Sequence, residues 1–181
     1  PQHTVFDLLK REKTAEEIII SSDQGDILPA DGSLAKAELA LNETGKEHRL
    51  RIGLQPIQAN YDYIIIDTPP ALGILAVNAL TASTGVIIPA QADSFNLQGI
   101  AQLYNTIYTV REFCNPKLPV LGILLTRYNR RTRISQEIKV ALEEATSGLG
   151  NKLYESSIRE CTAIKETQAI RGSIIKDAPK S

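Results

Sequence analysis

The sequence predicts an α/β domain with a doubly wound, mainly parallel sheet, and three observations support this fold class. Segments with the period of an amphipathic helix alternate with short apolar runs along most of the chain, as in repeated βαβ units. The strongest runs are apolar on both faces, which is typical of strands covered by helices on each side. The length of 181 residues also suits one compact domain. We therefore expect residues 1–181 to fold as a single domain.

The first part of the chain predicts short helices around one brief strand. Glu16 and Glu17 stand in the first turn of one helix, where carboxylates interact favourably with the helix dipole. Pro29 ends the strand, and Ser33 is placed to cap the helix that follows it. The expected elements are helices over residues 5–10 and 14–20, a strand over 26–30, a helix after Ser33, and an apolar stripe at Leu50, Leu54 and Ile57.

The remainder of the chain predicts strands and helices in alternation. Its three long apolar runs have the length of buried strands, and the segments between them have helical periodicity. The expected strands are residues 63–67, 85–90, 118–126 and 153–154, and the expected helices are residues 73–84, 96–114, 135–145 and 163–169.

Asp67 is the first candidate for a functional residue. An apolar run leads to its carboxylate, and Pro69 and Pro70 then stop the strand. Open α/β sheets bind their ligands at the carboxyl ends of parallel strands, and P-loop nucleotidases hold Mg²⁺ with an Asp in this place. Two interpretations stay open from the spacing alone: a metal ligand, or an Asp that only caps the following turn. The phosphate loop G-x-x-x-x-G-K-[ST] does not occur in the 181 residues.

Bulk composition excludes several classes of protein. The net charge of −1 gives no overall attraction to nucleic acid or membrane, so any such binding needs a local patch. Cys114 and Cys161 are too few for a disulfide framework, which favours a reducing, cytoplasmic setting. No apolar run reaches the length of a membrane span. The chain starts at Pro1 and contains no Met, so we expect further residues upstream.

A basic loop is the second candidate site. It holds four arginines within seven residues, namely Arg127, Arg130, Arg131 and Arg133. A solvated loop and a phosphate-binding patch are both compatible with this pattern. Phosphate contacts need only local positive charge and are independent of nucleic-acid sequence.

A series of short segments along nearly the whole chain carries a resemblance to a known family. The segments are T-V-F-D-L-L at residues 4–9, L-P-A at 28–30, Y-D-Y-I-I-I-D-T-P-P-A-L-G at 61–73, N-A-L-T-A at 78–82, I-P-A-Q-A-D at 88–93, L-Q-G at 97–99, G-I-L-L-T-R-Y-N-R-R-T at 122–132 and A-P-K-S at 178–181. In order and spacing they resemble the ParA/Soj partition ATPases. These belong to the MinD-like branch of P-loop nucleotidases, with a Rossmann-like three-layer fold and a deviant Walker-A loop.

The resemblance implies ATP and Mg²⁺ as ligands of the complete protein. It gives Asp67 the Walker-B position, where the carboxylate holds Mg²⁺ through a water. Thr68 and Pro69 fall in the switch segment that senses the γ-phosphate. Thr126 and Arg127 end a strand at the base of the nucleotide.

A second base-side loop is implied at residues 157–161, where the family usually reads I-P-R-N. The match assigns Ile158 and Arg159 to the nucleotide site. Arg159 stands where the family has proline, so the packing around the base differs from the family pattern here.

The resemblance further implies a role in plasmid or chromosome partition. In this family ATP closes two subunits into a homodimer, the dimer binds DNA without sequence preference, and a ParB-type centromere-binding protein stimulates hydrolysis. Arg131 matches a DNA-contacting arginine of the family, and Arg130 and Arg133 extend that surface. Lys165 stands in the neighbourhood of a second family arginine that has no match here. The implied location is the cytoplasm, on the nucleoid and away from membranes.

Departures from the family keep other functions open. The phosphate loop, the D-x-D-P-Q segment and the C-terminal helix have no counterpart in the chain, which indicates truncation at both ends of an ATP hydrolase. The alternatives are a non-catalytic DNA-binding or interaction module and a MinD-like regulator of a membrane process. An iron–sulfur reductase of the same superfamily would need both Cys114 and Cys161 as cluster ligands.

Overall fold

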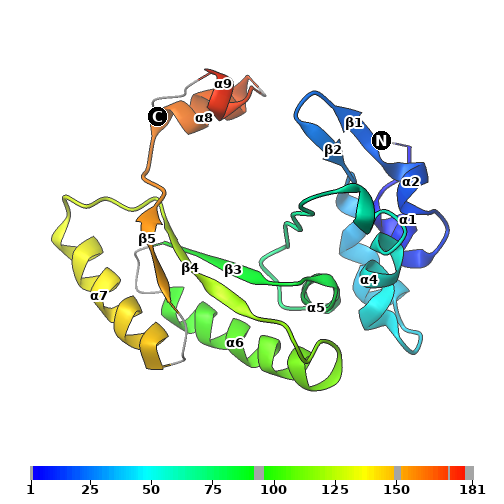
Figure 1. The fold of residues 1–181 in the computed structure, drawn as a ribbon, viewed down its shortest axis with the longest axis horizontal. Coiled ribbons are helices and arrows are strands. Elements are labelled where there is room, and N and C mark those ends of the chain that lie inside the picture. Colours follow the sequence, from blue (N-terminus) through cyan, green and yellow to red (C-terminus); the bar gives the residue numbers. More distant parts are fainter. Residues whose placement is uncertain (1, 92–95, 149–151, 171, 178–181) are drawn as a thin grey trace. The chain divides into compact units, whose positions relative to one another are not determined.

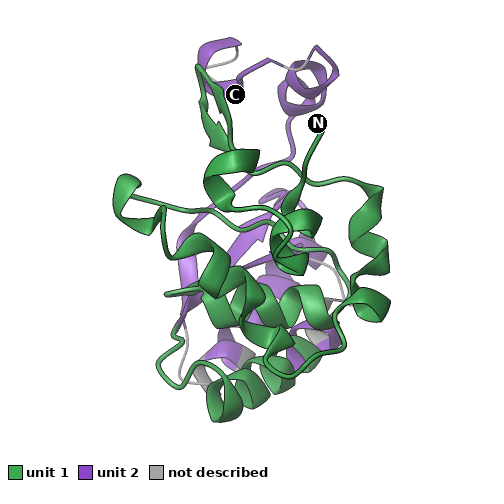
Figure 2. Cartoon of the chain, turned by 90° about the vertical axis from the view of Figure 1, so that its right-hand side faces the viewer, with its two compact units in different colours: residues 1–86, 102–119 green, residues 87–101, 120–181 purple. Residues whose placement is uncertain are grey.

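The computed structural model describes residues 2–91, 96–148, 152–170 and 172–177. The described chain forms two compact units (Figure 2), one from residues 1–86 and 102–119 and one from residues 87–101 and 120–181. The family-like segments at residues 92–93 and 178–181 lie outside the described residues. The expectation of a single domain over residues 1–181 stays a prediction.

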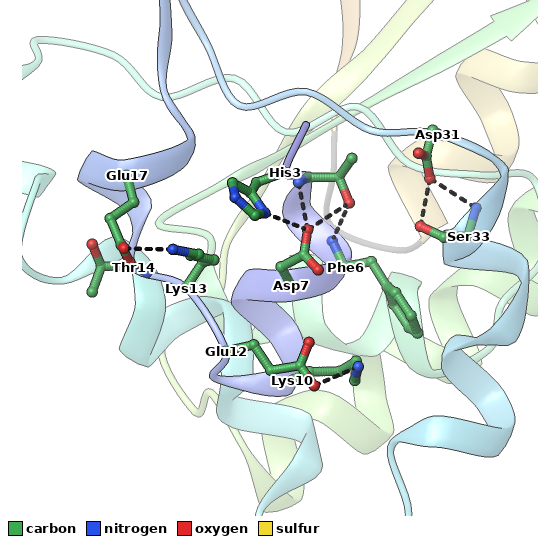
Figure 3. Close-up of polar contacts among 11 residues, drawn as sticks. His3, Phe6, Asp7, Lys10, Glu12, Lys13, Thr14, Glu17, Asp31 and Ser33 are labelled. Atoms are coloured by element: carbon green, nitrogen blue, oxygen red, sulfur yellow. Dashed lines mark hydrogen bonds and ion pairs between the residues drawn. The ribbon is translucent and has the colours of Figure 1, made fainter. Parts of the chain in front are cut away.

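The first unit begins with short helices whose starts follow local capping rules. The Thr4 N–H donates to Oδ2 of Asp7 at 2.7 Å, and the Thr14 N–H donates to Oε2 of Glu17 at 2.8 Å (Figure 3). Such reciprocal bonds satisfy the free N–H groups of a first turn. The elements are α1 (Val5–Lys10), α2 (Ala15–Ile18), β1 (Ile20–Ser22), β2 (Gly25–Ile27), η1 (Gly32–Lys36), α3 (Ala37–Ala40), η2 (Lys46–His48), α4 (Arg49–Leu54), η3 (Gln58–Asn60) and α5 (Ile74–Ala82).

The core of this unit is formed by the apolar faces that the sequence predicts. Leu8 and Leu9 of α1, Leu50 and Leu54 of α4, and Ile74 of α5 are all buried in one cluster. A single polar side chain ties its helices together: the buried Asn78 accepts a hydrogen bond from the Leu50 N–H at 3.0 Å and donates to the Lys46 carbonyl at 2.9 Å. A buried amide with satisfied hydrogen bonds fixes one arrangement of the elements it joins.

A hairpin replaces the end of one expected helix. The sequence predicts a helix over residues 14–20, but α2 ends at Ile18 and β1 pairs antiparallel with β2, Ile20 opposite Ile27. The predicted strand over residues 26–30 is therefore shorter than expected. Ile20 is β-branched and half exposed, which suits a hairpin strand better than a second helical turn.

The predicted strand over residues 63–67 is wrong. These residues run as an irregular trace that leads into α5 (Figure 1), and residues 62–72 make no backbone hydrogen bond to another described residue. Tyr63 and Ile65 are 84% and 88% exposed, whereas Ile66 packs on the core of the unit. A strand needs a neighbour for its backbone groups, and no described strand pairs with this run.

The second unit contains the parallel sheet. Its elements are β3 (Val86–Gln91), β4 (Val120–Thr126), α7 (Arg133–Gly148), β5 (Leu153–Ser157), α8 (Thr162–Ala169) and α9 (Ile174–Asp177), and α6 (Asn96–Phe113) contributes its first residues. The strand order is β3-β4-β5, with β4 and β5 parallel (Figure 1). Leu142 of α7 packs on Leu125 of β4 and Tyr128, which covers part of the sheet. This mixed architecture with a parallel sheet confirms the predicted fold class.

Gly122 permits the close pairing of β4 with β5. Its φ of +151° is rare for other residues, and a Cβ there would lie 2.9 Å from the Lys152 carbonyl oxygen. The register between these strands also shifts between Ile123 and Leu125. Glycine is the residue that tolerates such a close backbone approach.

None of the helices in the described part of the chain is both long enough and apolar enough to cross a membrane.

Candidate functional site

Asp67 stands in an exposed stretch of the first unit. It follows Ile66, which anchors the segment on the core, and it precedes Thr68 and Pro69, which are also exposed. Asp67 and Pro69 line a cavity of about 660 Å³ in this unit, together with mostly apolar side chains. The carboxylate makes no hydrogen bond or ion pair to another described residue. It is therefore available to a ligand from solvent.

The start of this stretch is fixed by a hydrogen bond that the sequence did not reveal. The Tyr61 hydroxyl donates to Oδ2 of Asp26 at 2.6 Å, which joins the stretch to the β1–β2 hairpin. This bond, assisted by Ser21, lowers the pKa of Asp26 below its ordinary value. The same bond raises the pKa of Tyr61, because the neutral phenol is the form that donates.

The far end of the stretch is fixed by a second residue that sequence reasoning missed. Glu38 of α3 accepts a hydrogen bond from the backbone N–H of Ile74, at the first residue of α5, with an N–O distance of 2.7 Å. The two residues are 36 positions apart. No local pattern signals such a contact, because capping motifs read only the few residues beside a helix start.

The donor set at Asp67 fits a Mg²⁺ ion that carries its own water and phosphate ligands. Mg²⁺ in nucleotide sites is held by one or two carboxylates, and several waters complete its octahedron. Among the described residues no cluster of three or more His, Cys, Asp or Glu side chains could hold a metal ion by itself. Asp67 is the residue that would hold Mg²⁺ through a water, as the family resemblance implies.

The candidate base-side residues meet in the second unit. The Ile158 N–H donates to the Leu125 carbonyl at 2.8 Å, and the Tyr128 N–H donates to the Ile158 carbonyl at 3.0 Å. These two bonds hold the loop after β5 against the turn after β4, so Thr126 and Arg127 stand beside Ile158. Arg127 has a φ of +52°, a left-handed conformation that turns the chain sharply at the strand end.

Arg127 and Lys165 share one carboxylate, which the sequence did not suggest. Glu160 Oε1 lies 3.1 Å from the Arg127 guanidinium and 3.3 Å from the Lys165 ammonium. Lys165 and Arg127 both lower the pKa of Glu160. All three side chains are about half exposed or more, so the cluster is a surface network. Arg159 is exposed beside it.

The remaining arginines of the basic loop differ in their partners. Arg133 is paired with Glu137, with 2.8 Å between Nε and Oε1. Among the described residues no carboxylate forms an ion pair with Arg130 or Arg131. The Arg131 N–H donates to Oδ1 of Asn129 at 3.0 Å, which shapes the loop and leaves the guanidinium in solvent.

Arg130 also lines a second hollow of this unit. The cavity has a volume of about 400 Å³ and is bounded by Tyr128, Lys139 and Tyr154 among others. Lys139 is paired with Glu143 at 3.3 Å. Glu155 also lines this cavity, so its wall carries charges of both signs.

The two cysteines belong to different units and both are free. Cys114 lies in the first unit and Cys161 in the second, each partly buried. Within the described residues neither belongs to a group of three or more His, Cys, Asp or Glu side chains that could hold a metal ion.

The candidate residues are thus distributed over both units. Asp67, Thr68 and Pro69 belong to the first unit, and the base-side and basic-loop residues belong to the second. Their assignment to nucleotide and DNA stays a prediction.

Comparisons with known proteins place the chain in a family. The model of the AAA domain matches residues 1–120. The chromosome partitioning protein ParA of Caulobacter vibrioides is 35% identical over 168 residues, which cover 90% of this chain and 62% of that protein. The sporulation initiation inhibitor protein Soj of Bacillus subtilis is 36% identical over 183 residues, which cover 99% of this chain and 71% of that protein.

A solved structure agrees with these matches. Cobyrinic acid a,c-diamide synthase from Mycobacterium smegmatis, with bound ADP and magnesium, aligns with a TM-score of 0.75 at 34% sequence identity. The match covers 78% of this chain and 59% of that one. The chain spans about three fifths of the Caulobacter protein and of this structure. From the family model and the Soj match, the chain belongs to the ParA/Soj family of P-loop partition ATPases.

Proposed function

We propose that the complete protein is a ParA-type ATPase that acts in plasmid or chromosome partition. The observation that carries the proposal is the state of Asp67: an exposed carboxylate without a protein partner among the described residues, followed by T-P-P and then by α5. This is the position where the family resemblance requires a Mg²⁺ ligand. Nucleotide and Mg²⁺ accompany a similar structure, which supports both as ligands here.

In this proposal the candidate residues of the first unit have separate roles. Asp67 would hold Mg²⁺ through a water, and Thr68 would belong to the switch segment that senses the γ-phosphate. A bound Mg²⁺ supplies charge neutralisation for the phosphates. Pro69 and Pro70 restrict the backbone of the switch segment, so that it responds to the presence of the γ-phosphate as a stiff piece.

The second unit supplies the contacts to base and DNA in this proposal. Thr126, Arg127, Ile158 and Arg159 form the base-side surface. Arg130 and Arg131 take the DNA phosphates, because their guanidinium groups have no carboxylate partner among the described residues. Arg133 and Lys165 contribute less, since each already pairs with a glutamate. Phosphate contacts of this kind bind DNA without sequence preference.

The partners follow from the same family. We propose that ATP drives homodimerisation, that the dimer holds non-specific DNA on the nucleoid in the cytoplasm, and that a ParB-type centromere-binding protein stimulates hydrolysis. In this cycle the γ-phosphate sets the fraction of subunits that are dimeric. No membrane is part of this cycle.

Asp67→Ala in the complete gene product tests the proposal. We expect Mg²⁺-dependent ATP hydrolysis to fall by on the order of 10²-fold, as for the loss of one electrostatic contact in a catalytic site. Steady-state phosphate release over a range of Mg²⁺ concentrations measures this. Asp62→Ala is the matched control, because Asp62 is an exposed aspartate of the same stretch.

Two outcomes would contradict the proposal. Unchanged hydrolysis in Asp67→Ala would reject the Walker-B role of this residue. A complete protein that binds DNA but turns over no ATP would favour the non-catalytic module, and nucleotide-dependent binding to lipid vesicles would favour the MinD-like regulator.

A further inference from the structure

The stretch that carries Asp67 is held at few points. Residues 62–72 form no helix or strand and make no backbone hydrogen bond to another described residue. Ile66 packs on the core, and residues 67–72 after it are all exposed. The next fixed point is the start of α5. The position of Asp67 and the prolines therefore depends on what holds that start.

Glu38 holds the start of α5 by a bond that α5 cannot make for itself. Gly73 is the N-cap residue and has no side chain, so it cannot satisfy the free N–H groups of the first turn. The Glu38 carboxylate takes over this task from α3, accepting from the Ile74 N–H at 2.7 Å. A carboxylate at this place also interacts favourably with the dipole of the nine-residue helix.

The contact with Glu38, and not an unusual backbone conformation, explains why position 73 is a glycine. Gly73 has a φ of −90°, which any residue can adopt. A Cβ at this position would lie 1.9 Å from Oε1 of Glu38. The absence of a side chain is thus needed for the carboxylate to reach the helix start. Glu38 and Gly73 form one fitted pair across 35 positions of sequence (73 − 38).

The link from this pair to Asp67 is short, and half of it is conformationally restricted. Pro69 and Pro70 fix their own φ near −65°, and a residue that precedes proline is restricted to extended conformations. Thr68 and Pro69 both precede proline. The hold on the start of α5 therefore limits where this restricted part of the segment can lie, since only Ala71 and Leu72 separate Pro70 from Gly73.

We propose that Glu38 is a positioning residue for the ATPase reaction. It clamps Gly73 and Ile74, and thereby fixes the far end of the switch segment that carries Asp67 and Thr68. This inference rests on the proposed function, because it names a further residue of the same site. In this inference Glu38 does not contact the nucleotide. It acts on the reaction only through the position of the switch segment.

The test compares variants of the complete gene product, measured first without nucleotide. Glu38→Ala removes the clamp, and we expect hydrogen exchange of the Ile74 N–H, which loses its acceptor, and protease cleavage within residues 67–73 to rise about fivefold, the factor typical of a lost helix cap. Glu38→Gln keeps an oxygen that accepts from the Ile74 N–H, and we expect near wild-type protection. Asp31→Ala is the matched control, since Asp31 caps η1 in the same unit through the Ser33 N–H (Figure 3).

A double-variant cycle tests whether Glu38 and Gly73 act as a pair. We expect Gly73→Ala to loosen the segment in the wild-type background, because the added methyl group displaces the carboxylate. In the Glu38→Ala background the same change should have little further effect. Independent, additive effects of the two substitutions would overturn the fitted pair.

Hydrolysis kinetics distinguish a positioning role from a merely structural cap. We expect Glu38→Ala to lower kcat about tenfold with KM for ATP within about twofold, because a displaced switch segment loses an interaction made mainly in the transition state. Glu38→Gln should restore kcat. A loosened segment with wild-type kcat would overturn the positioning role, and so would unchanged exchange of the Ile74 N–H together with unchanged cleavage within residues 67–73. A wild-type protein without hydrolysis would overturn the proposed function and this role together.

Discussion

At the scale of single residues, ion pairing divides the arginines of the basic loop. Arg127 is bound to Glu160 and Arg133 to Glu137, so their charges are partly compensated. Arg130 and Arg131 form no ion pair with a described carboxylate, so their positive charges are not compensated in this way. Surface ion pairs are weak, but they hold side chains in place and lower the local potential. In the proposed function, Arg130 and Arg131 are therefore the arginines of this loop that would contact a phosphate backbone first.

Arg131→Ala should weaken DNA binding equally on unrelated sequences. Loss of one phosphate contact lowers the slope of log K against log salt by about 0.9. We expect that decrease for Arg131→Ala, measured by fluorescence anisotropy on two duplexes of unrelated sequence with ATP present.

Two controls separate contact from net charge. Arg11→Ala removes one exposed positive charge from the first unit, and its salt slope should stay at the wild-type value. The double variant Arg133→Ala Glu137→Ala removes an ion pair without changing net charge, and it should bind DNA nearly as the wild type does. Equal losses in Arg131→Ala and Arg11→Ala would mean that the loop is only a solvated surface.

At the scale of elements, the stretch around Asp67 is held by side chains in place of a sheet. Tyr61 binds the β1–β2 hairpin, Ile66 packs on the core, and Glu38 holds the start of α5. Local stability is low where backbone hydrogen bonds are few. A segment of this kind can respond to a ligand, because few contacts must be broken when it moves.

The Tyr61–Asp26 bond gives this stretch a defined pH dependence. The folded pKa of Asp26 is lowered, so its contribution to stability is present above the ordinary value of 3.8 and is lost as pH falls through the lowered pKa. The folded pKa of Tyr61 is raised, so its contribution is present below the ordinary value of 10.0 and is lost as pH rises through the raised pKa. The bond therefore stabilises the fold between these limits.

Tyr61→Phe should accordingly lower the free energy of unfolding near neutral pH, with a smaller difference from wild type at both pH extremes. Urea unfolding followed by circular dichroism across the pH range measures this difference. Tyr63→Phe is the control, because Tyr63 is 84% exposed and has no hydrogen bond to another described residue. If the difference in unfolding free energy between Tyr61→Phe and wild type were the same at every pH, the bond between the Tyr61 hydroxyl and Asp26 would not be the source of that difference.

At the scale of the whole molecule, the candidate residues belong to two compact units. Asp67 and its switch segment are in the first, and the base-side and basic surfaces are in the second. Nucleotide hydrolysis needs more than these residues, because phosphates must also be cradled by backbone N–H groups and a lysine. The sequence of the 181 residues contains no such G-x-x-x-x-G-K-[ST] loop.

The 181-residue chain by itself should therefore show no Mg²⁺-dependent ATP turnover above background. A coupled phosphate assay at saturating ATP measures this, with the complete gene product as the positive control. Turnover by the 181-residue chain that is abolished in Asp67→Ala would show that these residues suffice for the chemistry.

Most element types could be predicted because they depend on near neighbours in sequence. The bounds of α1 match the prediction, since Thr4 and Asp7 form its cap within one turn. The strands β3, β4 and β5 also arise where apolar runs predict them. The run before Asp67 shows where this logic fails: apolar residues favour a strand, but pairing decides whether one forms.

By itself, the sequence determined the fold class, the family and the candidate residues, because periodicity and motif spacing are written in the order of the chain. Only the tertiary structure decided which of these residues carry partners. It paired Arg127 with Glu160, left Asp67 without a protein partner among the described residues, and brought Glu38 to the start of α5. Contacts between residues more than 30 positions apart depend on how elements pack, and no local pattern encodes that packing.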